Sequence, residues 1–71
     1  MFELKLTLID LFDSEFKGKS YKNAQFIDCQ SLTIIYGSFE KEKCPSLTLG
    51  KDYTCECYVS NNKIKVRDVK I

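Results

Sequence analysis

Residues 2–11 read FELKLTLIDL, and this stretch decides the fold. Every second residue from Phe2 to Leu8 is apolar and the residues between are charged or polar, which is the period-two pattern of a half-buried β-strand. The alternation then slips by one residue, because Leu8 and Ile9 are adjacent and Leu11 follows on the opposite parity. Such a slip predicts a β-bulge or a sharp bend. A long first strand that bends in this way is typical of a small closed barrel, in which it serves two sides of the sheet.

The rest of the chain repeats the alternation, with a second slip of parity at Arg67-Asp68. This pattern predicts four further strands: Tyr21–Cys29, Leu32–Tyr36 ending at Gly37, a strand that begins after Gly50 and runs through Val59, and Lys63–Ile71.

The connections are indicated by polar and turn-forming residues. Asp13–Ser20 (DSEFKGKS) is polar around Gly18 and is interpreted as the connection of the first hairpin. Ser38–Ser46 is charged, contains the one proline, and is expected to be a loop with at most one helical turn. Asn61-Asn62 lies between two alternating runs, and Asn tolerates the positive φ angles of a tight hairpin turn.

Five strands without a convincing helix predict an all-β fold and a single domain over residues 1–71. An open five-stranded sheet leaves two exposed edges, so closure into a small antiparallel barrel is favoured. The bent first strand favours the OB type, with an SH3-like barrel as the alternative.

Composition limits the partners and the compartment. The 44% hydrophobic and 30% charged residues suit a folded domain, although a chain of 71 residues has a thin core. Eleven Lys and Arg against ten Asp and Glu give a net charge of +1, so binding to nucleic acid would depend on a local cluster of positive charge. No segment has the roughly 18 apolar residues of a membrane span, and Met1–Asp13 carries charges that a signal peptide lacks, so the cytoplasm is the expected location.

The absence of His argues against catalysis. Histidine is the commonest general base near neutral pH, and without it Ser-His and Cys-His nucleophilic sites are impossible. The three glycines form no phosphate-binding loop, and the acidic residues show no spacing typical of a catalytic pair. We therefore expect a binding protein without catalytic residues or cofactor.

The four cysteines allow two interpretations. Cys55 and Cys57 form a C-x-C whose side chains point to one face of a strand, and Cys29 and Cys44 could complete a Cys₄ zinc site. Structural zinc usually uses paired C-x₂-C knuckles, which are missing here, so we expect no metal and interpret the pair as small buried hydrophobic residues. Disulfides are not expected in a reducing compartment, and Cys44, in a charged loop, is the residue expected to be a reactive surface thiol.

Basic residues interleaved with aromatic ones form the remaining candidate site. In proteins that bind single-stranded nucleic acid, Lys and Arg contact the phosphates, and each base stacked on an aromatic ring contributes about 1–3 kcal/mol to the binding free energy. A purely structural role is the alternative, because Tyr is common in strands and Lys keeps strand edges soluble. The candidate residues are Phe16, Lys17, Lys19, Tyr21, Lys22, Tyr36, Tyr58, Lys63, Lys65 and Arg67.

Three segments resemble one known family in matching order. Gly18–Tyr21 (GKSY) resembles the G-K-x-Y segment of the filamentous-phage gene V proteins, which are small OB-fold single-stranded DNA-binding proteins. Leu49–Tyr53 (LGKDY) is similar to that family's G-x-Y entry into a strand, and Ile64–Ile71 resembles its apolar and basic last strand. The loop Phe39–Pro45 departs from the family because it is shorter and mixed in charge.

The resemblance implies that Tyr21 stacks on a base and that Lys19 and Lys22 meet phosphates. It also implies a homodimer that binds two antiparallel DNA strands cooperatively. The resulting expectation is a sequence-tolerant single-stranded DNA-binding protein of a phage or mobile element, acting in DNA replication, with RNA left open as a ligand. The alternative is a protein-interaction adaptor or inhibitor built on an SH3-like or OB barrel.

Overall fold

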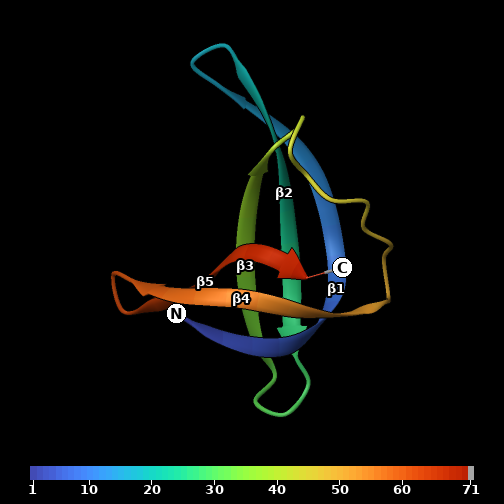
Figure 1. Ribbon diagram of the computed structural model, residues 1–71, viewed down its shortest axis with the longest axis vertical. Helices are drawn as coiled ribbons and strands as arrows, with labels where there is room; N and C mark the ends of the chain where they lie inside the picture. The colour runs from blue at the N-terminus through green and yellow to red at the C-terminus, as the bar shows by residue number, and fades with distance from the viewer. Residues whose placement is uncertain (71) are drawn as a thin grey trace.

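The computed structural model describes residues 1–70 and shows a closed five-stranded β-barrel (Figure 1). The predicted all-β barrel is therefore confirmed. Ile71, predicted as the end of the last strand, lies outside the described residues. The strands are β1 (Phe2–Phe16), β2 (Lys19–Asp28), β3 (Thr33–Glu40), β4 (Asp52–Ser60) and β5 (Lys63–Lys70).

The strands close in the order β1-β2-β3-β5-β4. Within residues 1–70, β3 and β5 run parallel, whereas the other neighbouring pairs are antiparallel. The chain passes from β3 to the far side of β5 before it forms β4, which makes this a Greek-key order rather than a meander. A five-stranded Greek-key barrel is of the OB type.

The first strand serves two sides of the barrel, as its sequence predicts. Residues Phe2–Thr7 pair with β4, and residues Thr7–Phe16 pair with β2. Between Leu8 and Asp10 the register against β2 shifts, so Ile9 is an extra residue on β1. The predicted bulge is therefore confirmed.

The second predicted slip of parity is also a bulge. Glu56 pairs with Asp68 and Cys57 with Val66, which leaves Arg67 as the extra residue on β5. Each bulge lets one strand bend and continue with the opposite parity, as a small barrel requires.

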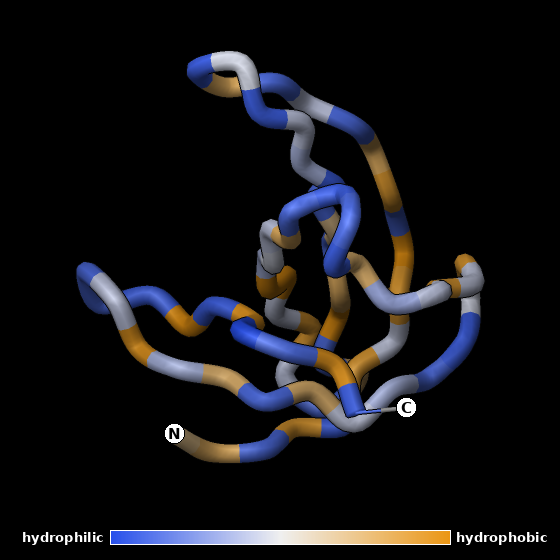
Figure 2. The backbone as a smooth tube through the Cα atoms, turned by 45° about the horizontal axis from the view of Figure 1, so that its top comes forward, coloured by the Kyte–Doolittle hydropathy of each residue, from blue (hydrophilic) through white to orange (hydrophobic). Residues whose placement is uncertain are grey.

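The barrel interior is filled by apolar side chains, and hydrophobic and hydrophilic residues alternate along the strands (Figure 2). Cys55 and Cys57 are completely buried, so their interpretation as small buried hydrophobic residues is confirmed. Gly37 lies where β3 meets β5, and a Cβ there would stand 3.0 Å from the Cβ of Val66. The largest fully buried side chains are Phe26, Leu6, Leu8, Ile35, Cys55 and Cys57.

The predicted loop Asp13–Ser20 is wrong, because β1 and β2 remain paired up to Phe16 and Lys19. Only Lys17 and Gly18 connect them, with φ angles of 51° and 76°. The segment is polar because both of its faces meet solvent, and backbone pairing does not require apolar side chains. We call Glu15–Ser20 the arm, since β1 and β2 continue here beyond the last pair between β2 and β3.

The predicted end of the third strand at Gly37 is also wrong, because β3 continues to Glu40. Phe39 resumes the buried parity after Gly37, so the glycine marks close packing rather than a strand end. The loop that was predicted to begin at Ser38 therefore begins only after Glu40. It contains no helix, and within residues 1–70 no helix could span a membrane.

The predicted turn at Asn61-Asn62 is confirmed, since both residues have positive φ angles, 51° and 62°. The arm and the β4–β5 hairpin project from the barrel (Figure 1). The tips of both hairpins are mostly hydrophilic, whereas hydrophobic and hydrophilic residues alternate along the strands (Figure 2).

Candidate nucleic-acid interface

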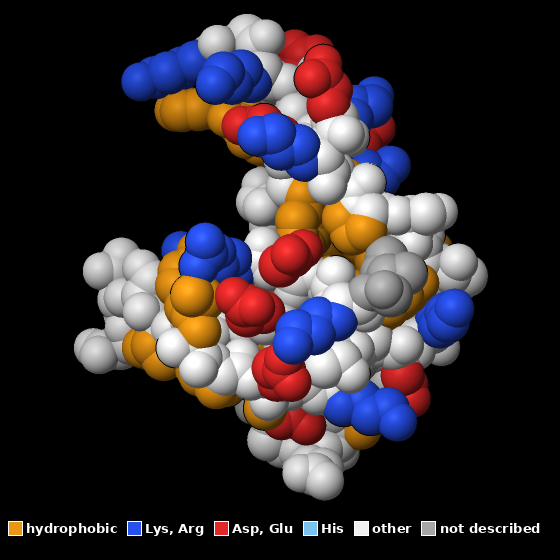
Figure 3. Space-filling model, viewed as in Figure 1, with side chains coloured by type: hydrophobic (Ala, Val, Ile, Leu, Met, Phe, Trp, Pro, Cys, Tyr) orange, Lys and Arg blue, Asp and Glu red, His pale blue; other side chains and the backbone are white. Residues whose placement is uncertain are grey.

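A groove of about 470 Å³ runs over the outer face of the barrel, between the arm and the β4–β5 hairpin. Figure 3 shows the molecule hollowed between these two projections. We call this site the outer groove. It is lined by Phe12, Ser14, Asn23, Tyr36, Gly37, Ser38, Tyr58, Lys65 and Val66.

One row of the outer groove crosses β3, β5 and β4. Tyr36 is the register partner of Lys65 on β5, and Lys65 is in turn the partner of Tyr58 on β4. Partners in neighbouring strands point to the same face, so Lys65 stands between the two tyrosines in this row. Tyr36 is 54% exposed and Tyr58 37% exposed, which leaves both rings accessible to a ligand.

The next row crosses β1, β2 and β3 and is made by Phe12, Asn23 and Ser38. Phe12 is 45% exposed although it is aromatic. The side-chain Nδ2 of Asn23 donates a hydrogen bond to Ser14 Oγ at 2.6 Å. The groove therefore combines aromatic walls with a small polar floor, a combination typical of ligand sites.

The arm continues the same outer face. Phe16 pairs with Lys19, and the Nζ of Lys17 lies 5.3 Å from the centre of the Phe16 ring, within the range of a cation–π contact. Phe16 is 64% exposed. Tyr21 is half-buried on this face, opposite Ser14 on β1. The structure thus brings six of the predicted residues to one face, namely Phe16, Lys19, Tyr21, Tyr36, Tyr58 and Lys65.

Of the ten predicted residues, only Tyr36, Tyr58 and Lys65 line the outer groove itself. Phe16, Lys17, Lys19 and Tyr21 lie on or beside the arm, and the remaining three lie elsewhere. Lys22 shares the inward parity of β2 and its Nζ lies 3.3 Å from a carboxylate oxygen of Asp13. Lys63 begins β5 beside the Asn61-Asn62 turn. Arg67 is the bulge residue, and its guanidinium contacts the sulfur of Met1 at 3.1 Å.

Sequence reasoning missed Phe12 and Asn23. The signal for Phe12 was present, because the slip at Leu8-Ile9 that turns Leu11 toward the core necessarily turns Phe12 outward. Asn23 had no comparable signal, since its role depends on Ser14, which lies nine residues away along the chain.

The cysteines lie in three different environments. Burial, together with the neighbouring Cys57, raises the pKa of the Cys55 thiol to about 12, and burial also raises the pKa of Cys57. Cys29 is exposed. Residues 1–70 contain no group of three or more Cys, Asp or Glu side chains that could hold a metal ion.

The expectation that Cys44 is the reactive surface thiol is wrong. Cys44 lies in the β3–β4 connection, is partly buried, packs against the core, and donates to the carbonyl oxygen of Pro45 at 3.3 Å. Burial raises its pKa, an effect that Lys22 opposes and Asp13 reinforces. A thiol with a raised pKa is a poor nucleophile, so exposed Cys29 is the accessible cysteine.

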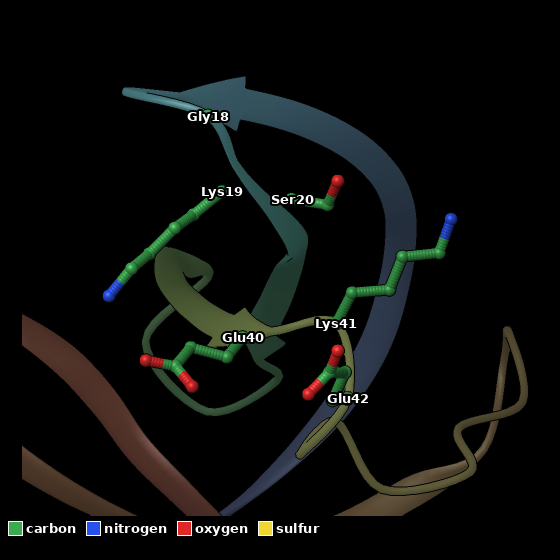
Figure 4. A pocket seen from close by; sticks show the side chains of 6 residues that line it. All are labelled: Gly18, Lys19, Ser20, Glu40, Lys41 and Glu42. Carbon is green, nitrogen blue, oxygen red and sulfur yellow. The ribbon is translucent and has the colours of Figure 1, made fainter.

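A second hollow lies between the arm and the end of β3 and is lined by Gly18, Lys19, Ser20, Glu40, Lys41 and Glu42 (Figure 4). The side chains of Lys19 and Lys41 extend away from each other, and the carboxylates of Glu40 and Glu42 lie near the end of β3. Because acidic and basic groups are mixed, this hollow is less suited to a polyanion than the outer groove.

No protein-family model, no curated protein and no solved structure matches this chain. The resemblance to the gene V proteins therefore rests on the sequence motifs alone. The homodimer, the cytoplasmic location, the link to phages or mobile elements and the absence of catalysis stay predictions.

Proposed function

We propose that this chain is a sequence-tolerant single-stranded DNA-binding protein that uses the outer groove and the arm. The observation that carries the proposal is the row Tyr36–Lys65–Tyr58 on the outer face. Exposed aromatic rings provide stacking platforms for bases of any sequence, and a cation between them is placed to meet a phosphate. In OB-type barrels the face of the second and third strands and the hairpin loops are where oligonucleotides bind, which agrees with this location.

Local charge supports the proposal although the net charge is only +1. Lys65 lies in the groove, and Lys17 and Lys19 extend the positive charge along the arm. We therefore assign the phosphate contacts to these three lysines. Lys22 is engaged with Asp13 and is assigned no contact.

The test is a fluorescence titration of the full chain with oligo-dT at low salt, repeated as the salt concentration increases. The logarithm of the binding constant should fall linearly with the logarithm of the salt concentration. Each phosphate contact on a single strand contributes a slope of about −0.7, so three lysines predict a slope of roughly −2. Absence of binding at low salt would overturn the proposal.

A protein-interaction adaptor is the second candidate, and two observations favour it. Charges of both signs are interspersed on the face shown in Figure 3. In addition, the apolar side chains of Leu32 and Ile34 are 75% and 46% exposed, and Ile34 lies on the outer face of β3, two residues from Tyr36. The titration separates the candidates, because an adaptor using this apolar surface would show no salt-dependent binding to oligo-dT.

A further inference from the structure

The floor of the outer groove carries three short polar side chains between the aromatic ones. Ser14, Asn23 and Ser38 lie on the outer face of three adjacent strands, and all three line the groove. A site that only stacked bases would not need them. Their position lets them meet the edge of a base whose flat face rests on Tyr36 or Phe12.

The hydrogen bond within the floor orients the amide of Asn23. Its Nδ2 donates to Ser14 Oγ at 2.6 Å, which directs one N–H of the amide to the serine. Asn23 keeps its carbonyl oxygen as an acceptor for a ligand, beside the second N–H of the amide. The hydroxyl group of Ser38, on the neighbouring strand, can donate or accept as the ligand requires.

We propose that the outer groove reads the hydrogen-bonding edge of one base and favours a base with an imide N–H, that is, thymine or uracil. This inference rests on the proposed function and adds a preference at one nucleotide to a site that is otherwise tolerant of sequence. Asn23 Oδ1 accepts the proton at N3 of the base, and the Ser38 hydroxyl donates to the adjacent carbonyl oxygen. Cytosine presents an acceptor at N3, which would face the acceptor of Asn23 without a proton between them.

Unstacked bases in single strands are commonly held in this way, by an aromatic ring on the face and hydrogen bonds on the edge. The expected preference follows from the size of one hydrogen bond. A net contribution of roughly 0.5–1.5 kcal/mol corresponds to a ratio of about 2- to 13-fold in affinity.

The experiment compares three oligonucleotides of equal length on the unmodified protein: oligo-dT, oligo-dC, and oligo-dT carrying N3-methylthymidine. The methyl group replaces the imide proton and leaves both carbonyl oxygens in place. We expect the protein to bind oligo-dT about 2- to 13-fold more tightly than either of the other two. Equal binding of all three would overturn the inference but leave the proposed function standing, whereas no binding to any of them would overturn the proposed function.

The variant Asn23→Ala tests whether Asn23 causes the preference for thymine. It should lower the affinity for oligo-dT to the level of oligo-dC and leave oligo-dC binding unchanged. An equal loss for both oligonucleotides would overturn the role of Asn23. Because the first comparison uses the unmodified protein, it decides the base preference even where the variant fails to fold.

Discussion

The two faces of β3 differ in what their residues do, although they alternate along the same eight residues. Ile35 and Phe39 point inward and are 2% and 8% exposed. Ile34 and Tyr36 point outward and are 46% and 54% exposed. These four side chains are all apolar or aromatic, although Ser38 and Glu40 share the outer face, so hydropathy does not separate them. Burial does, and it indicates that the inner face supports the fold while the outer face is available for a ligand.

This difference shows that stability and binding are carried by separate sets of side chains on the same strands. In a chain of 71 residues with a thin core, large exposed aromatic side chains contribute little to folding. Their presence on one face is therefore better explained by binding. The comparison between the faces can be tested by making the same substitution on each.

The largest effect is expected from Phe→Ala on the inner face. Phe26 is completely buried, and Phe26→Ala should lower the free energy of unfolding by about 3–5 kcal/mol, since it removes a ring from a close-packed interior. Phe12→Ala, the matched change on the outer face, should alter it by only about 0.5 kcal/mol. Urea denaturation measures both values. Equal losses of unfolding free energy in the two variants would contradict the conclusion that the inner face, and not the outer face, supports the fold.

The inner face could largely be predicted from the sequence. Alternation placed Leu6, Phe26 and Cys55 inside, and the two slips of parity located both bulges, because burial of one face imposes a strict period of two. The strand ends were predicted less well. Apart from Phe16 the arm is polar on both faces, and Gly37 resembles a turn residue. Neither segment therefore carries a pattern that marks a continuing strand.

The site could be predicted only in part. Tyr36, Tyr58 and Lys65 were recognised as candidates, but nothing in the sequence placed them in one row, since the row depends on the parallel pairing of β3 with β5. Lys22 was expected to meet phosphates because it is one of the basic residues interleaved with aromatic ones, and because the resemblance implies such a contact. Adjacent strand residues point to opposite faces, and the structure accordingly separates Lys22 from Tyr21.

The second prediction concerns binding by the outer face. Tyr36→Ala should weaken oligo-dT binding by about 1–3 kcal/mol, the contribution of one stacked base, and leave the free energy of unfolding almost unchanged. Ile34→Ala is the matched control, because Ile34 is similarly exposed on the same face of β3 but does not line the groove. Fluorescence titration and urea denaturation separate the two properties. An equal loss of binding in both variants would show that the groove is not the site.

The third prediction uses the buried thiols of the inner face. Cys55 ionises near its ordinary pKa of 9.0 in the unfolded chain but only at about 12 in the barrel. Between these values the unfolded chain binds fewer protons than the folded one, so stability falls as the pH rises above 9, by at most about 1.4 kcal/mol per pH unit for this group.

Cys55→Val isolates this contribution, because valine cannot ionise and is similar in volume. Between pH 8 and pH 10.5 the free energy of unfolding of the unmodified protein should fall more steeply than that of the variant. Parallel curves would mean that the Cys55 thiol ionises equally well in the folded and unfolded chains.

The smallest effect is expected from substitutions at the tips of the two hairpins, the arm and the β4–β5 hairpin. These two turns can be compared directly. Lys17 and Asn61 occupy the first position of their turns with the same φ angle of 51°. Asn tolerates this conformation well, whereas Lys does so less readily. The arm thus keeps a lysine where a better turn residue would fit, which suggests that the side chain itself is needed there.

The reciprocal variants Lys17→Asn and Asn61→Lys test this suggestion. Lys17→Asn should change the free energy of unfolding by no more than about 0.5 kcal/mol, because the improved turn is offset by the lost contact with the Phe16 ring. Salt-dependent titrations should then show a slope shallower by about 0.7, the contribution of one phosphate contact. Asn61→Lys should leave the slope unchanged, because the phosphate contacts are assigned to the groove and the arm. If Lys17→Asn does not change the slope of the salt dependence, the lysine at the tip of the arm contacts no phosphate.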